Sequence, residues 1–413
     1  MTSSAGRGLL HLAAAVDQPG AYGAAPYVEL ARLAERGGLD FVTLDDTFAR
    51  PGPDAPAVLS RVAPATHRIG LVPTVTTTHT EPFHVQAAVA ALDWVSRGRA
   101  GWRIDVSTTE GEARLFGRRH AAAPDALWRE AGEVADVAAR LWDSWEDGAE
   151  RPAAGPGRAT APSFTDRPFT DRSFAAGHSS AGHVPAQRSA TEGPFTEGTP
   201  AEGQFGEAPF GEAPFTDPEK LHHVDFTGTS FSVRGPATVP RPPQGHPVRV
   251  VDATDGPARA TAARYADVVL IRVADPARAR SVRDALRAEA AEAGRDPRAL
   301  RVLVSLLIDL GDGEHAADPG HGGGGPRATA QGPLYRGGPV DLADLIATWH
   351  REGAADGFHL TPLEPRRDLE RLVNGTVALL QHRGLFRTFY PGSTLREHLG
   401  LGRPANRYAE GAR

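Results

Sequence analysis

Short apolar runs alternate with amphipathic stretches along most of the chain. We expect strands at eight of these runs: residues 9–16, 41–44, 69–75, 99–107, 248–251, 267–273, 300–310 and 357–360. Helical stretches separate the runs, and in the most regular one, 126–145, apolar side chains recur every three or four residues. Strands that alternate with helices favour a parallel sheet. Eight such units favour a closed (β/α)8 TIM barrel, of the α/β class, over an open sheet.

The pattern is interrupted between the fourth and fifth units. Residues 151–216 are rich in Gly, Pro, Ser, Thr and Glu, and contain the near-repeats SFTDR, PFTDR and GEAPF. Few apolar side chains are present there to offset the loss of backbone entropy, so we expect a disordered low-complexity insertion. The alternative is an interaction segment that uses its phenylalanines. The predicted organisation is listed in chain order: a first half of the barrel at 1–150, the insertion at 151–216, a second half at 217–400 with a loose Gly-rich loop near 311–338, and a C-terminal tail at 401–413.

Composition narrows the possible functions. The net charge of −6 indicates no basic surface of the kind that binds nucleic acid or an anionic membrane. The absence of cysteine removes disulfides and thiolate metal sites, and the histidines lack the carboxylate company of a metal centre. No apolar run approaches 18 residues and no secretory leader is evident. We therefore expect a cytoplasmic protein without a bound metal.

The stretch GRAGWRIDVS, residues 98–107, is expected to carry functional side chains. It reads as a buried strand, and in parallel α/β proteins ligands bind at the carboxyl ends of the strands. Arg103, Asp105 and Ser107 are therefore candidates for ligand contact. The alternative for Arg103 is an interior arginine paired with Asp105 or Asp46. Because neighbouring strand residues point to opposite faces, only one acid of the Asp45–Asp46 pair can face a pocket.

Several motifs together resemble the bacterial luciferase-like, flavin-dependent monooxygenases, in the branch that includes nitrilotriacetate and dibenzothiophene-sulfone monooxygenases. The similarity covers nearly the whole chain outside the two loose segments. It rests on LDFVTLDDTF (39–48), IGLVPTVTTTHTEPFHV (69–85), LDWVSRGRAGW (92–102), LWDSWEDGA (141–149), DPEKLHHVDFTGTSFSVRGPATVPRPPQGHPV (217–248), DGFHLTP (356–362) and RGLFRTFYPGSTLREHLGL (383–401).

The resemblance implies a barrel that binds reduced FMN, supplied by a separate flavin reductase, and uses O₂ to oxygenate a small organic substrate. It also implies a homo-oligomer. No catalytic residue is assigned from it. The residues that it places near the cofactor are Asp46, Thr74, Thr76, Arg103, Ser107, Trp128, Thr254 and Gly256.

Several positions depart from the family pattern on the cofactor side. Arg103 stands where the family has an asparagine beside the flavin, and Pro124 and Trp128 stand where it has a histidine and a tyrosine. Asp252 and Asp255 lie in the expected phosphate region, where carboxylates oppose a phosphate. These departures leave an alternative open, namely a non-catalytic barrel that binds flavin poorly and acts as a partner or regulatory subunit.

Overall fold

Eight parallel strands form a closed barrel in the computed structural model, which describes residues 8–150, 216–311, 313–314 and 325–409. Each strand pairs with the next along the chain, and the last one, β12, pairs back with β1. The strands are β1 (His11–Ala15), β2 (Phe41–Leu44), β3 (Gly70–Thr76), β4 (Gly101–Asp105), β7 (Val248–Asp252), β8 (Val268–Ile271), β9 (Arg301–Asp309) and β12 (Gly357–Pro362). The predicted (β/α)8 barrel is thereby confirmed. The insertion predicted at 151–216 lies, apart from Thr216, outside the described residues.

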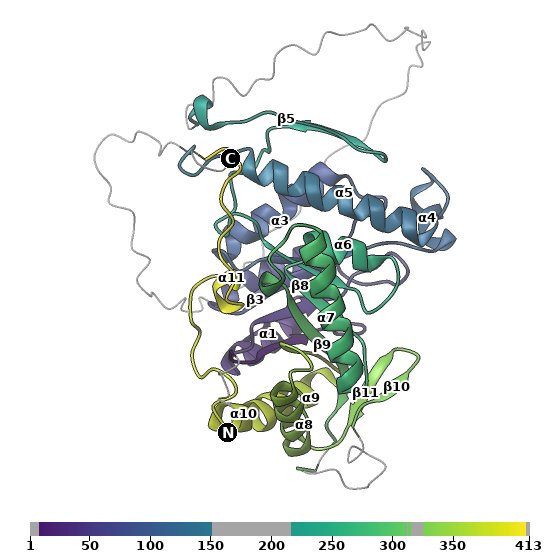
Figure 1. Cartoon of the computed structure of the whole chain (residues 1–413), viewed down its shortest axis with the longest axis vertical. Helices are drawn as coiled ribbons and strands as arrows, with labels where there is room; N and C mark the ends of the chain where they lie inside the picture. Colours follow the sequence, from purple (N-terminus) through teal and green to yellow (C-terminus); the bar gives the residue numbers. More distant parts are fainter. Residues whose placement is uncertain (1–7, 151–215, 312, 315–324, 410–413) are drawn as a thin grey trace, which may run out of the picture. The chain divides into compact units, whose positions relative to one another are not determined.

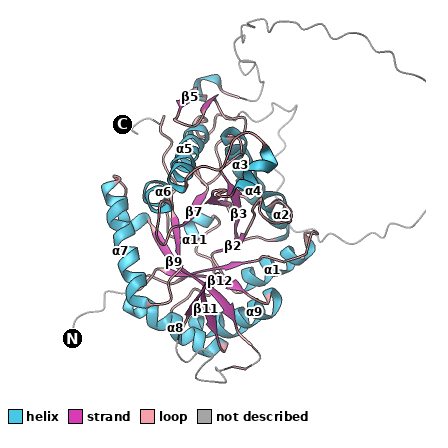
Figure 2. Ribbon diagram, turned by 90° about the vertical axis from the view of Figure 1, so that its right-hand side faces the viewer, coloured by secondary structure: helices cyan, strands magenta, loops and turns pink. Residues whose placement is uncertain are grey.

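Helices cover the outside of the strands (Figures 1 and 2). They are α1 (Ala25–Arg36), α2 (Ala55–Val62), α3 (Pro82–Ser96), α4 (Glu110–Phe116), α5 (Pro124–Asp143), α6 (Ala258–Tyr265), α7 (Pro276–Glu292), α8 (Pro339–Glu352), α9 (Pro365–Arg371) and α10 (Ala378–His382). A further short helix, α11 (Leu395–His398), lies at the amino-terminal end of the barrel. A π-helical turn, Leu372–Val377, separates α9 from α10. Among the described residues, no helix combines the length and apolar character needed to cross a membrane.

Two separate apolar clusters follow from the alternation of side chains along each strand. The larger cluster lies between strands and helices. The smaller one fills the inside of the barrel and consists of Ala13, Phe41, Val72, Val248, Val250, Val268, Leu270 and Leu303, with Leu395, Leu399 and Leu401. Leu395 belongs to α11, and Leu399 and Leu401 follow this helix. Because Leu395 donates its N–H to the carbonyl of Gly98, which lies just before β4, α11 closes the amino-terminal end of the barrel.

The expected loose segment 311–338 contains a hairpin, formed by β10 (Arg327–Thr329) and β11 (Gly332–Arg336). β8 pairs with β9 only as far as Val304, so the end of β9 would have a free edge on that side. β11 pairs with β9 at 307–309 and covers this edge. The sequence prediction missed the hairpin because its strands are short and partly exposed. A second short hairpin, β5 (Val224–Thr227) and β6 (Ser232–Gly235), packs against α5.

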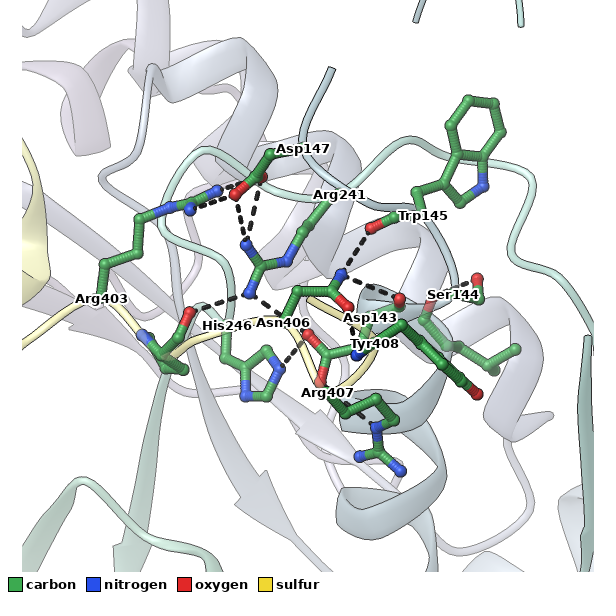
Figure 3. A network of polar contacts seen from close by, with 12 residues as sticks. Asp143, Ser144, Trp145, Asp147, Arg241, His246, Arg403, Asn406, Arg407 and Tyr408 are labelled. Atoms are coloured by element: carbon green, nitrogen blue, oxygen red, sulfur yellow. Dashed lines mark hydrogen bonds and ion pairs between the residues drawn. The ribbon is translucent and has the colours of Figure 1, made fainter. Parts of the chain in front are cut away.

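Residues 401–409, predicted as a C-terminal tail, are held against the end of α5 by a polar network (Figure 3). Asn406 donates to the carbonyls of Asp143 and Trp145, at 3.0 and 2.8 Å. Arg403 forms a bidentate ion pair with Asp147, at 2.7 Å for each contact, and Arg241 bridges Asp147 and Asp143. The buried Asp143 carboxylate is thus compensated, and the end of the described chain belongs to the barrel body.

Gly357 is required where the barrel closes. A Cβ built on this glycine would lie 1.9 Å from the carbonyl oxygen of His11 on β1. Because neither backbone can move without breaking the pairing of β1 and β12, we expect Gly357→Ala to lower the free energy of unfolding by at least about 3 kcal/mol. Urea unfolding followed by circular dichroism measures this change.

The matched control is Gly111→Ala in α4, where the nearest atom lies 3.9 Å from the built Cβ. This substitution is expected to be neutral or slightly stabilising. Equal stability of the two variants would contradict the proposed packing at the closure.

Candidate active site

Polar side chains point inward at the carboxyl ends of the strands. On β4 and β7 the inward positions are apolar or glycine near the amino end and become charged toward the carboxyl end. On β4 the inward series runs from Gly101 through Arg103 to Asp105, and on β7 it runs from Val250 to Asp252. Charged groups that point inward at this end need partners or a ligand, because burying them alone is unfavourable.

Arg103 lies among carboxylates at this end of the barrel. Its nearest ion pair is with Asp45, at 3.6 Å, and Arg50 binds the same carboxylate from the following loop at 2.6 Å. The nearest partner is therefore Asp45 and not Asp46, whereas Asp105 raises the pKa of Arg103 without an ion pair within 4 Å in the described part of the chain. The physical reason is that the side chain of Asp45 shares the inward face with Arg103, whereas Asp46 is directed to the other side.

The electrostatics at Arg103 favour its charged form. Burial disfavours the charge, yet the pKa of Arg103 is raised because four acids surround it: Asp45, Asp105, Asp252 and Asp17. Burial in turn raises the pKa of Asp17 and of Asp105, and the cation of Arg103 only partly offsets this effect. The arginine is therefore the main counter-charge for an acidic group of side chains.

His359, on β12, is a buried neutral group that lines the same cavity as Arg103. Its Nε2 lies 2.8 Å from the Thr43 hydroxyl and its Nδ1 lies 3.1 Å from the Ser305 hydroxyl. Burial lowers the pKa of His359, and the guanidiniums of Arg103 and Arg272 lower it further, to about 3. The imidazole is therefore neutral at physiological pH and ties three strands together inside the barrel.

Two cavities open at the carboxyl ends. The inner one, of about 130 Å³, is lined by Arg103, His359 and their neighbours. The outer one, of about 700 Å³, lies over β1, β2 and β12. The cavities share five lining residues: Asp17, Asp45, Leu307, Gln331 and Thr361. They therefore form adjoining parts of one polar depression, and Gln331 in the turn of the β10–β11 hairpin belongs to its wall.

Three of the predicted site residues lie on β3 and just after β4. Thr74 is aligned with Arg103 and Thr76 with Asp105, which places both threonines on the inward face. Ser107 donates its backbone N–H to the Thr78 hydroxyl at 3.1 Å. The hydroxyl groups of Thr74 and Ser107 are buried and have no hydrogen-bond partner in the described part of the chain. Buried hydroxyls without partners are candidates for ligand contact.

Asp46 and Trp128 have structural contacts. The carboxylate of Asp46 accepts the N–H of Ala55 at 2.9 Å, next to the start of α2, and lines only the outer cavity. Trp128 is half-buried on α5, and its backbone carbonyl accepts a hydrogen bond from the Thr261 hydroxyl on α6 at 2.8 Å. Trp128 thus lies beside the helix that follows Thr254 and Gly256.

Thr254 and Gly256 form the loop between β7 and α6. The Thr254 hydroxyl accepts the backbone N–H of Arg272 at 2.6 Å. Gly256 adopts a φ of +77° and faces open space. Both acids of this loop are paired with arginines, Asp252 with Arg272 at 2.6 Å and Asp255 with Arg278 at 2.8 Å. The loop is therefore close to electrically neutral, which the sequence comparison alone did not indicate.

Sequence reasoning missed Asp17, Arg272, Arg278, Ser305 and His359. All except Arg278 could have been found by extending the period of two along a predicted strand to its polar end: Ala15 leads to Asp17, Leu270 to Arg272, Leu303 to Ser305 and Gly357 to His359. Arg278 gives no such signal, since it lies in the first turn of α7 and its role depends on a loop distant in sequence.

A closed (β/α)8 barrel with a polar cavity at the carboxyl ends of its strands defines the class of TIM-barrel enzymes. The sequence model described as "Luciferase-like monooxygenase" matches residues 7–190 and 219–367. The chain belongs to the luciferase-like monooxygenase family.

Named relatives extend this assignment. The chain is 28% identical to N-acetyl-S-(2-succino)cysteine monooxygenase of Bacillus subtilis (strain 168), over 93% of this chain and 91% of that one. It is 29% identical to nitrilotriacetate monooxygenase component A of Aminobacter aminovorans, with the same coverage of 93% and 91%. Among solved structures, a riboflavin lyase with modified FMN and riboflavin superposes with a TM-score of 0.72 at 19% identity, over 96% of this chain and 97% of that one.

The predicted luciferase-like, flavin-dependent monooxygenase is thereby confirmed as a family, and the enzyme is favoured over the non-catalytic barrel. The individual site residues remain predictions.

His359 makes the stability of the barrel depend on pH. The pKa of its imidazole is lower in the folded state than in the unfolded chain, so only the unfolded chain binds the proton between about pH 6.5 and 3. Stability is therefore complete above the unfolded pKa and falls as the pH drops below it. From pH 6.5 to pH 5 we expect wild type to lose about 1.5 kcal/mol more than His359→Asn, in urea unfolding at each pH.

His84→Asn, a substitution of an exposed histidine on α3, serves as the control and should keep the wild-type pH profile. If His359→Asn and wild type lose stability in parallel, the imidazole is not neutral in the folded protein.

Proposed function

We propose that this chain is the oxygenating component of a two-component monooxygenase, in which reduced FMN from a separate flavin reductase binds at the carboxyl end of the barrel and O₂ oxidises a small organic substrate. The observation that carries the proposal is the double cavity at that end, in a chain of this family. The riboflavin lyase of similar fold contains a modified FMN, which supports the choice of cofactor.

The ring of a flavin requires space and hydrogen-bonding groups. Ligand pockets for molecules of this size hold about 300–1,000 Å³. The outer cavity, with about 700 Å³, lies in that range, whereas the inner cavity of about 130 Å³ does not. The hydroxyls of Thr74 and Ser107, which have no partner in the described part of the chain, lie at the same end of the barrel but outside the lining of both cavities, and offer further donors and acceptors to a bound flavin. On these observations the residues present fit the ring, with Arg103 at the inner edge of the site.

The phosphate of FMN requires positive charge or N–H donors. Asp252 and Asp255 stand against it, but each is neutralised by an arginine. Arg278 and Asp255 are both more than half exposed, so their ion pair is weak and the guanidinium is available to a more highly charged anion. Together with the open backbone at Gly256, this arrangement fits a phosphate and favours Arg278 as its counter-charge.

Reduced FMN, when bound, supplies the electrons that activate O₂ for transfer of one oxygen atom to the substrate. The chain's own residues position the cofactor and exclude water. Apolar side chains inside the barrel, among them Val250 and Leu270, close the space below the inner cavity. Arg103 holds the acids around it in fixed positions, and Arg50 and Asp45 line the path from the outer cavity. Where apolar side chains exclude water, each polar contact made in the site becomes stronger.

Flavin titration tests the proposal. We expect the full chain to quench the fluorescence of FMN with saturation below about 100 μM, a generous limit for small ligands. The same chain, mixed with a flavin reductase, NADH and O₂, is expected to oxidise a substrate. Absence of saturable binding for both oxidised and reduced FMN would support a non-catalytic partner subunit in place of the enzyme.

Asp255→Asn tests the phosphate contact. The substitution removes a negative charge next to the proposed phosphate and releases Arg278. Since one charge at a few ångströms in water is worth about 1 kcal/mol, FMN is expected to bind about fivefold more tightly. Fluorescence titration measures the dissociation constant.

The matched control is Asp344→Asn, which breaks a comparable exposed pair with Arg383 (2.7 Å) on the helices α8 and α10. This variant is expected to bind FMN like wild type. Unchanged or weaker binding by Asp255→Asn would mean that the phosphate lies elsewhere.

A further inference from the structure

A second large cavity lies at the opposite, amino-terminal end of the strands. Its volume is about 740 Å³. Its wall is formed by α7, by the end of α8 and by the residues that lead into β1, β9 and β12. Four of its lining residues are arginines, Arg280, Arg283, Arg287 and Arg301, and two are acids, Glu352 and Asp356. Because the flavin-type site is at the other end of the barrel, none of these groups belongs to the proposed oxygenation chemistry.

Three of the arginines form a row on α7. Arg280, Arg283 and Arg287 are three and four residues apart, which places their side chains on one face of the helix. Like charges at this spacing destabilise a helix by a few tenths of a kcal/mol per pair. The row therefore has an energetic cost in the free protein that an anion would remove.

Backbone carbonyls fix the positions of these side chains. Arg280 donates to the carbonyl of Glu352 at 2.5 Å, and Arg283 donates to the carbonyl of Gly353, at the end of α8. Arg301 donates to the carbonyls of Leu399 and Gly400 at 2.8 and 3.0 Å. These contacts orient the guanidiniums, but a carbonyl dipole does not cancel a full positive charge. Each guanidinium carries five N–H donors, so further donors remain for a ligand.

Carboxylates compensate only part of the charge. Asp356 pairs with Arg287 at 2.9 Å, and Asp284 pairs with Arg283 at 2.7 Å. Within the described ranges, Arg280 and Arg301 have no carboxylate within 4 Å. Burial lowers the pKa of Arg301, while the charge of Asp356 acts in the opposite direction and the charge of Arg287 adds to the lowering. With Glu352 included, three carboxylates face four guanidiniums, so the cavity has an excess of one positive charge on oriented side chains.

We infer that this cavity binds a small, multiply charged oxyanion of the phosphate class. Guanidinium groups match the geometry of phosphate oxygens and bind them in pairs of hydrogen bonds. The cavity is large enough for an organic phosphate rather than a single ion only. A ligand here would connect α7, the end of α8 and the start of β9, and would stabilise the barrel at the end remote from the flavin.

Titration calorimetry with inorganic pyrophosphate tests the inference on the full chain. We expect a dissociation constant below about 1 mM at low salt, which weakens as ionic strength rises. Arg280→Gln is expected to weaken binding about tenfold without loss of fold, because Arg280 is exposed and on the helix surface. Arg280→Lys, which keeps the charge but loses the fork, is expected to show an intermediate loss.

Arg278→Gln on the same helix distinguishes the two ends of the barrel. It removes the proposed flavin phosphate contact and should leave pyrophosphate binding at wild-type strength. If Arg278→Gln abolishes binding and Arg280→Gln does not, the anion binds at the flavin end and the inference is overturned. The inference is also overturned if calorimetry detects no binding heat at 10 mM pyrophosphate, or if citrate binds and pyrophosphate does not. Absence of pyrophosphate binding, or binding of citrate alone, says nothing about whether the wild-type chain binds flavin. Both results therefore leave the proposed function standing.

Discussion

Pairing between β1 and β12 is the constraint on which the rest of the structure depends. It closes the sheet, and closure fixes which side chain of every strand faces inward. The buried carboxylate of Asp40 supports the closure, since it accepts the N–H of Leu12 at 2.7 Å and binds Arg387 at 2.8 Å. Burial raises the pKa of such a group, but Arg387 and His11 reverse the effect and lower it. A charged acid is thereby tolerated at the bottom of the barrel, where it connects β1, the loop before β2 and the C-terminal region.

The alternation of inward and outward side chains along each strand also explains the chemistry at the carboxyl end of the barrel. An inward position near the carboxyl end of a strand is either part of the ligand site or in need of a partner. Four acids occupy such positions around Arg103, and a neutral residue there would leave Asp17 and Asp105 without their main counter-charge. This gives a physical reason for arginine where the family resemblance has asparagine. Arg103 and Asp252, two of the departures from the family pattern, thus interact electrostatically with each other.

Most of the barrel could be predicted from the sequence, because strands buried on both faces and amphipathic helices give strong periodic signals. The bounds of β2 agree with the predicted range 41–44, and all eight barrel strands were expected. The hairpin β10–β11 could not be predicted, since its stability comes from the free edge of β9, which exists only in the closed barrel. For the same reason the pairing of Asp255 with Arg278 was invisible: it joins a loop to a helix across one complete β-strand unit. Periodicity reports which face a residue occupies, and not which distant residue meets it.

Arginine serves different purposes at the two ends of the barrel, and the partners make the difference. At the carboxyl end, Arg272 and Arg278 meet carboxylates, so the loop after β7 is neutral until an anion displaces an acid. At the amino end, Arg280 and Arg301 meet carbonyl oxygens, which orient a guanidinium and leave its charge in place. At an arginine paired with a carboxylate, an incoming anion must compete with that carboxylate. At an arginine bound to backbone carbonyls, an anion can bind without displacing another negative charge. The proposed flavin phosphate and the proposed oxyanion would lie at opposite ends of the barrel, and the distance between these ends keeps their mutual repulsion small.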